Sequence, residues 1–229
     1  QLTGSVVIGG DATVVTNAPP AGSPIGTVTI SEPLEIKAFD YGTSNPSLTG
    51  GDCTQVGTWN AGTKTCTLTA DIQVSGSDYG IQIGKNVPGI SYTEMFPAAE
   101  GITINGNGHT ITGSGAENGG HIGVDIYRTA NITIKNLIIE NFYGGINADL
   151  GQAITITGNT VSVMSQQSEI RVQSSGYCPN CGSGLSITNN ITGVIDVSGF
   201  RGNGTCNTSL PYFTPSNFSS ASAPVTSPS

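Results

Sequence analysis

Gly101-Ile-Thr-Ile-Asn-Gly-Asn-Gly-His-Thr-Ile111 is the first of four similar stretches in this chain. The other three are Asn131-Ile-Thr-Ile-Lys-Asn-Leu-Ile-Ile139, Ala153-Ile-Thr-Ile-Thr-Gly-Asn-Thr-Val161 and Leu185-Ser-Ile-Thr-Asn-Asn-Ile-Thr192. Each stretch has an apolar–polar–apolar strand, a corner that contains Asn or Gly, and a second β-branched strand. The central isoleucines are 30, 22 and 31 residues apart; they are Ile104, Ile134, Ile156 and Ile187. A repeat of roughly 20–30 residues that carries strands and no helical pattern indicates a β-solenoid.

The alternation within these strands predicts which side chains stack inside the solenoid. We expect one inward column made of Ile102, Ile104, Ile132, Ile134, Ile154, Ile156, Leu185 and Ile187. Asparagine tolerates left-handed backbone and can hydrogen-bond between rungs, so we expect the corners at Asn107, Asn136, Asn159 and either Asn189 or Asn190. Companion strands are expected at 123–127, 145–149, 169–173 and 194–197. An antiparallel sandwich also uses short alternating strands, but it gives no reason for one Ile-Thr-Ile motif to recur.

Composition divides the chain into three parts. Residues 1–50 contain β-branched runs at 5–8, 12–15 and 27–30 and an alternating stretch at 34–39, which predict an N-terminal strand segment able to pair with another subunit. Residues 51–199 are the predicted β-helix, in which 53–72 reads as a hairpin closed by a Cys53–Cys66 disulfide. Residues 200–229 are rich in Ser, Thr and Pro and predict a low-complexity, glycosylated tail.

The overall composition favours an all-β protein and excludes two classes of partner. Glycine (33) and proline (12) are frequent, and only 10% of the residues are charged, against roughly 25% in typical soluble domains. Seven basic and fifteen acidic residues give a net charge of −8, so no basic surface is expected for nucleic acid or an anionic membrane. No run of 18 apolar residues occurs, so we expect no membrane span. The sequence opens on mixed polar residues, as a mature chain does after its leader is removed.

Cysteines and glycosylation sequons favour export to the cell surface. The five cysteines are Cys53, Cys66, Cys178, Cys181 and Cys206. We expect Cys178 and Cys181 to form a loop disulfide, or one of them to pair with Cys206, which leaves one cysteine unpaired or bonded to another chain. Sequons of the form Asn-x-Ser/Thr begin at Asn131, Asn190, Asn203, Asn207 and Asn217. We therefore expect a secreted, disulfide-bonded glycoprotein.

The repeats resemble the parallel β-helix repeats of the pectin-lyase-like superfamily, most closely the repeat-rich surface and periplasmic proteins of archaea and bacteria. The segment from Cys53 through Gly57-Thr-Trp59 to Cys66-Thr-Leu68 resembles the lead-in that precedes such repeats in exported proteins. The resemblance covers residues 53–199 and implies a right-handed parallel β-helix. It does not define an activity, because the superfamily contains lyases, hydrolases, adhesins and structural proteins.

The sequence offers no convincing catalytic group and no cofactor site. Asp125 with Arg128, and Asp149 one rung later at a nearly equivalent position, could stack about 4.8 Å apart and bind Ca²⁺. Two exposed acidic residues on adjacent strands are the simpler interpretation. His109 at a corner and His121 before a strand have no acid or nucleophile nearby in the sequence.

These observations predict a structural subunit of an extracellular filament, sheath or surface layer rather than an enzyme. Its expected partners are further copies of the chain and covalent glycans, because a solenoid without a capping helix ends in open strand edges. The alternative is a secreted β-helix that binds or cleaves polysaccharide.

Overall fold

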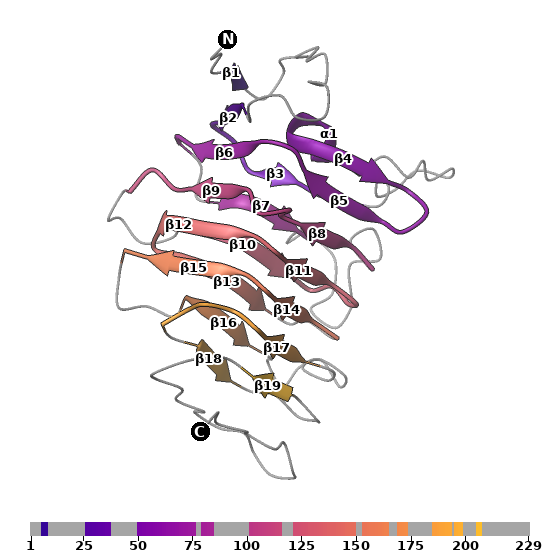
Figure 1. Cartoon of the computed structure of the whole chain (residues 1–229), viewed down its shortest axis with the longest axis vertical. Helices are drawn as coiled ribbons and strands as arrows, with labels where there is room; N and C mark the ends of the chain where they lie inside the picture. Colours follow the sequence, from indigo (N-terminus) through magenta and orange to yellow (C-terminus); the bar gives the residue numbers. More distant parts are fainter. Residues whose placement is uncertain are drawn as a thin grey trace, which may run out of the picture.

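The computed structural model describes residues 6–8, 26–37, 50–76, 79–84, 101–115, 121–149, 153–164, 169–173, 185–193, 195–198 and 205–207. The strands in these ranges form three sheets that run the length of the molecule, with β1 near one end of the long axis and β18 and β19 near the other (Figure 1). All but one of the strand pairs are parallel. This is the arrangement of a right-handed parallel β-helix, so the predicted fold class is confirmed.

We name the sheets A, B and C. Sheet A contains, in spatial order, β1 (Val6–Ile8), β2 (Thr27–Ile30), β6 (Asp71–Val74), β9 (Thr110–Thr112), β12 (Ile138–Phe142) and β15 (Thr160–Val163). Sheet B contains β3 (Leu34–Glu35), β7 (Tyr79–Ile83), β10 (Ile122–Tyr127), β13 (Gly144–Asp149), β16 (Ile170–Gln173) and β18 (Ile195–Ser198). Sheet C contains β4 (Gly57–Asn60), β5 (Thr65–Leu68), β8 (Thr103–Asn105), β11 (Thr133–Lys135), β14 (Thr155–Thr157), β17 (Ser186–Thr188) and β19 (Thr205–Asn207).

The inward column of sheet C confirms the repeat that the sequence shows. The Cα partners across its rungs run from Ile104 through Ile134 and Ile156 to Ile187. All eight residues predicted to face inward are buried, each with at most 2% of its surface exposed. Burying an isoleucine side chain contributes roughly 1.5–3 kcal/mol, so four such rungs supply a continuous core without any helix. The companion strands predicted from the sequence form most of sheet B.

Asparagines at the corners take two different roles. Asn107, Asn136 and Asn189 have left-handed backbone, with φ between 53° and 55°, and Gly158 takes the equivalent place in its rung with φ 66°. Asn159 and Asn190 instead point inward and are buried. Both members of the Asn189–Asn190 pair are therefore used, one for the backbone turn and one for the interior.

The N-terminal strands continue the sheets of the β-helix. The runs at 5–8 and 27–30 become β1 and β2 of sheet A, whereas the run at 12–15 lies outside the described residues. Within the stretch at 34–39, Leu34–Glu35 forms β3, and Ile36 N still donates to Gln82 O of β7, whereas residues 38 and 39 lie outside the described residues. Most of the C-terminal tail and the boundary at residue 200 lie outside the described residues.

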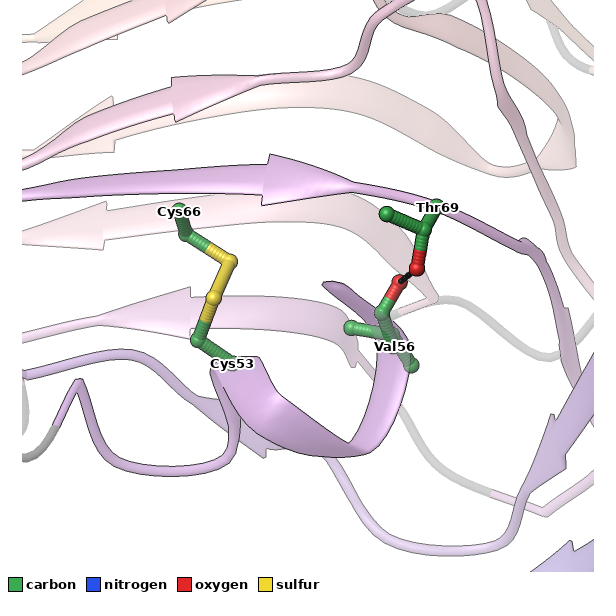
Figure 2. Close-up of a disulfide and its surroundings, with 4 residues drawn as sticks. All are labelled: Cys53, Val56, Cys66 and Thr69. Carbon is green, nitrogen blue, oxygen red and sulfur yellow. Dashed lines mark hydrogen bonds between the residues drawn. A yellow bond between two sulfur atoms is a disulfide. The ribbon is translucent and has the colours of Figure 1, made fainter. Parts of the chain in front are cut away.

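The hairpin predicted for residues 53–72 requires a correction. Its arms are β4 and β5, joined by the turn at 61–64, but Cys53 lies on a four-residue helix, α1 (Cys53–Val56), rather than on an arm. The Cys53–Cys66 disulfide exists and ties α1 to β5, while Thr69 bonds through both its amide and its hydroxyl to the carbonyl of Val56 (Figure 2). Asp52 holds this turn through Gln55, which donates from both its backbone and its side chain. A single helical turn is too short to leave a periodic pattern in the sequence.

We expect the Cys53→Ala/Cys66→Ala double variant to lose about 3 kcal/mol of unfolding free energy, because the disulfide closes a loop between residues 13 apart. Urea unfolding followed by far-UV circular dichroism measures the loss. Thr58→Ala on the neighbouring strand is the control and should change stability by less than about 0.5 kcal/mol. Equal stability of the double variant and the native chain would contradict a stabilising role for this bond.

Candidate functional site

A buried asparagine pair connects the last described rungs between sheets C and A. Asn159 Nδ2 donates to the carbonyl of Ile134 at 3.0 Å, and Asn190 Nδ2 donates to the carbonyl of Ile156 at 2.9 Å. The Oδ1 atom of each accepts a backbone N–H from the preceding rung, from Leu137 at 3.1 Å and Asn159 at 2.9 Å. Each side chain therefore satisfies one donor and one acceptor that the sharp corner would leave buried and unpaired.

This pair decides the state of one predicted glycosylation site. Asn190 is fully buried, and the nitrogen that would carry a glycan is already bonded to Ile156 O. Thr192, the third residue of the same sequon, is also buried, and its hydroxyl donates to Glu169 Oε2 at 2.5 Å. Because a glycan on Asn190 would have to displace this hydrogen bond inside the folded rung, we expect Asn190 to be unmodified.

The remaining sequons are placed differently. Asn131 is exposed at the corner before β11, with φ 58°, so this sequon lies on the surface. Asn207 ends β19, but its side chain lies outside the described part of the structure, as do Asn203 and Asn217 entirely. The sequence could not separate Asn131 from Asn190, because both precede the same kind of Ile-Thr pair.

We expect glycopeptide mass analysis of the native protein to find Asn131 modified and Asn190 bare. The physical reason is access: the glycan is attached to the amide nitrogen, which is at the surface in one residue and hydrogen-bonded inside a rung in the other. Modification at Asn190 in folded, soluble protein would contradict the described corner.

A column of charged and amide side chains runs along the outer face of sheet B. Its members, paired Cα to Cα from rung to rung, are Glu35, Gln82, Asp125, Asn147, Arg171 and Asp196. Asn147 Nδ2 donates to Asp125 Oδ1 at 2.8 Å, and Arg171 Nε lies 3.9 Å from Asp196 Oδ2. No two side chains of like charge occupy adjacent rungs of this column.

Neither sequence interpretation of Asp125 and Asp149 holds, because the two carboxylates do not stack and Asp125 is buried rather than exposed. Asp125 pairs with Asn147 across the rung, and Asp149 pairs with Tyr127, so the two carboxylates lie two positions apart along the strands. Arg128 is buried at a corner with φ 52°, its guanidinium 5.9 Å from the Tyr127 ring centroid and its backbone N–H bonded to Asp149 O. The prediction that these residues lie on adjacent rungs is confirmed, but the predicted register differs from the observed one by two residues.

Burial sets the chemistry of Asp125. Although it belongs to the outer column, only 7% of its surface is exposed, and this desolvation raises the pKa of its carboxyl above the ordinary value. Hydrogen bonds from Asn147 and Gln82 act in the opposite direction and lower the pKa, whereas the negative charge of Asp149 raises it further. The charged form of Asp125 is therefore disfavoured in the folded protein.

We expect the protein to lose stability as the pH rises from the ordinary carboxyl pKa near 3.8 through the raised pKa of Asp125. The folded state binds its proton more tightly than the unfolded state, so the penalty is absent below this window and complete above it. Asp125→Asn keeps an acceptor for Asn147 and removes the charge, so it should be more stable than the native chain at neutral pH. Urea unfolding across pH 4–8 measures the stability of the native chain and of the variant. Asp196→Asn, which removes the last carboxylate of the same column, is the control. Equal pH profiles for the native chain and Asp125→Asn would contradict this role.

An acid does lie beside one of the two histidines, which corrects the sequence analysis. His109 is buried, and its Nδ1 lies 3.1 Å from Asp71 Oδ1, an oxygen that also accepts the backbone N–H of Thr110 at 2.9 Å. Asp71 comes from β6, 38 residues earlier, so no local sequence pattern indicates the contact. The pair joins two neighbouring rungs of sheet A, as a structural contact does. His121 precedes β10, and its carbonyl accepts backbone N–H groups from Tyr143 and Gly144.

The remaining predicted site residues are only partly placed. The Cα of Cys206 pairs with Ile187 in β19, whereas its side chain, and all of Cys178 and Cys181, lie outside the described residues. Across the described ranges, no group of three or more His, Cys, Asp or Glu side chains could hold a metal ion. Among the same residues, no helix has the length and apolar character that crossing a membrane requires.

The fold and these sites define a parallel β-helix with a disulfide-bonded N-terminal end. The model of the pectate lyase-like adhesive domain family matches residues 59–175, which is about half of the chain. The chain belongs to this family, and its role is accordingly that of an adhesive surface β-helix. No curated protein and no solved structure matches the chain significantly. An adhesive domain that carries a disulfide is typical of exported surface proteins, because disulfides persist in oxidising compartments.

Proposed function

We propose that this protein is a structural, adhesive subunit at the cell surface that assembles with further copies of itself through the ends of its β-helix. The observation that carries the proposal is the state of the three sheets at their two ends. In the described residues each sheet begins on a strand with one neighbour, namely β1, β3 or β4. Sheets B and C likewise end on β18 and β19, and sheet A ends on β15 with a single bridge from Thr160 to Ile191.

Edge strands present unpaired N–H and C=O groups that can pair with another chain. Proteins commonly protect such edges with charged residues or proline, and β1 (Val6–Ile8), β4 (Gly57–Asn60) and β19 (Thr205–Asn207) contain neither. The one described helix, α1, has only four residues and packs against β4 and β5. These edges suit addition of a further rung from a second copy.

The other end of sheet A offers an apolar contact. Ile191 bridges Thr160 as the first residue of a further rung and exposes 65% of its surface. An apolar, β-branched strand such as β1 (Val6–Ile8) has the shape to pack there. A head-to-tail contact of this kind uses two different surfaces, so it produces a filament unless the rotation closes a ring.

We further propose that the subunit acts without catalysis. The two carboxylates that the sequence suggested as a possible Ca²⁺ site, Asp125 and Asp149, do not stack, since Asn147 is the rung neighbour of Asp125. Release of reducing ends from polygalacturonate by the purified protein would contradict this part of the proposal.

We expect light scattering of the native chain to show a mass that grows with concentration well beyond the 23.2 kDa of one copy, and negative-stain images to show filaments. Val6→Pro and Val7→Pro test the edge, because alternate residues of a strand direct their N–H groups to opposite neighbours and one of the two faces away from β2. The proline variant at the residue whose N–H faces away from β2 should block assembly, while the melting temperature of the subunit stays within a few degrees.

Val6→Ala and Val7→Ala are the matched controls, since they shorten the same side chains and keep both N–H groups. If the native chain is a monodisperse monomer at every concentration, or if neither proline variant alters the assembly, contacts through β1 are not the basis of the polymer.

A further inference from the structure

The outer face of sheet C is an array of hydroxyl groups. Six of its strands have described side chains, and each places two residues on the outer face. Of these twelve residues, eight are threonine, one is serine, two are asparagine and one is lysine. We call them the hydroxyl face: Thr58, Asn60, Thr65, Thr67, Thr103, Asn105, Thr133, Lys135, Thr155, Thr157, Ser186 and Thr188.

The register orders these residues in two straight columns. One runs Thr65, Thr103, Thr133, Thr155 and Ser186 through successive rungs. Neighbouring groups in a column are about 4.8 Å apart, and the two columns are about 6.6 Å apart. Because threonine is stiff at χ1 and each residue sits in a paired strand, the hydroxyl groups are held in place before any ligand arrives.

Hydroxyl residues alone do not distinguish this face. Threonine favours exposed strand positions in any sheet, and the outer positions of sheet A include Thr110, Thr112 and Thr160. The difference lies in charge. Outer positions of sheet A include Asp71 and Glu140, and those of sheet B include the charged residues Glu35, Asp125, Asp149, Arg171 and Asp196. Among the described outer residues of sheet C, Lys135 alone is charged.

We propose that the hydroxyl face is the adhesive surface and that it binds an uncharged polysaccharide lying across the rungs. The proposal deepens the adhesive, non-catalytic function proposed above and rests on it. Hydroxyl groups both donate and accept hydrogen bonds, so an array of them complements the hydroxyl groups of sugar rings. The methyl groups of the threonine side chains can pack against the carbon–hydrogen surfaces of the rings. A face with a single cation gives no advantage to a polyanion.

The repetition of the face determines how binding should depend on ligand length. A single neutral hydrogen bond in water contributes little net affinity, because the ligand exchanges it for one with solvent. Contacts on successive rungs act together once the first is made, so affinity should rise with chain length. Glucose should therefore fail to compete at concentrations at which a soluble cello-oligosaccharide does.

The test is co-sedimentation of the full chain with microcrystalline cellulose, chitin and, as the charged polymer, calcium-gelled polygalacturonate. We expect the native chain to sediment with at least one neutral polymer, and Thr133→Val/Thr155→Val to bind it at least tenfold more weakly. The two substitutions are isosteric and keep β-branching, so melting temperature should change little. Thr160→Val, on the outer face of sheet A, is the matched control and should bind as the native chain does.

Each other result overturns the proposal. Equal binding by all variants places adhesion elsewhere, binding to polygalacturonate alone indicates the charged face of sheet B, and failure to bind either neutral polymer removes the ligand class. Light scattering of the same variants separates this proposal from assembly: if Thr133→Val/Thr155→Val loses polymer mass, the face joins copies and is not the adhesive surface. Normal filaments with no polysaccharide binding would overturn only this inference.

Discussion

The structure depends on one constraint, which is that successive rungs stay in register along their inward isoleucines. Ile104, Ile134, Ile156 and Ile187 occupy one column, and a shift by one residue would turn every threonine inward and every isoleucine outward. Successive members of this column are 22 to 31 residues apart in the sequence, and their pairing is nevertheless the same in every rung. The same register places the residues of the hydroxyl face and of the charged column on the outside.

The corners maintain that register at the point where the chain turns most sharply. Asn159 and Asn190 exchange hydrogen bonds with the backbone of the preceding rung, so each rung is fixed to its neighbour by side chains as well as by the ladder. In the preceding rung Leu137 takes the equivalent inward place and is buried. Apolar packing and amide bonding are thus alternative solutions to one position, and the amide solution is the one that conceals a glycosylation sequon.

The two faces explain how a stable core can support different surface properties. Strands of sheet C alternate buried and outward residues, whereas β10 and β13 of sheet B bury consecutive residues, yet all three sheets surround one apolar core. Sheet B has charged and amide side chains at outward positions, including the buried carboxyl of Asp125, and sheet C has mostly hydroxyl groups there. A solenoid that joins end to end would extend both faces along a filament, which multiplies weak contacts with a repetitive partner.

The sequence by itself determined the fold class, the repeat and the inward column, because alternation of Ile and Thr is a local pattern with a fixed period. It also determined the Cys53–Cys66 bond as a pair, although it placed Cys53 on a strand, since a four-residue helix leaves no period. Only the tertiary structure decided which residues from different rungs meet: His109 with Asp71, Asp125 with Asn147 rather than Asp149, and Asn190 with Ile156. Those contacts depend on how many residues separate the strands of successive rungs. Because these separations are unequal, the sequence alone does not show which residues become rung neighbours.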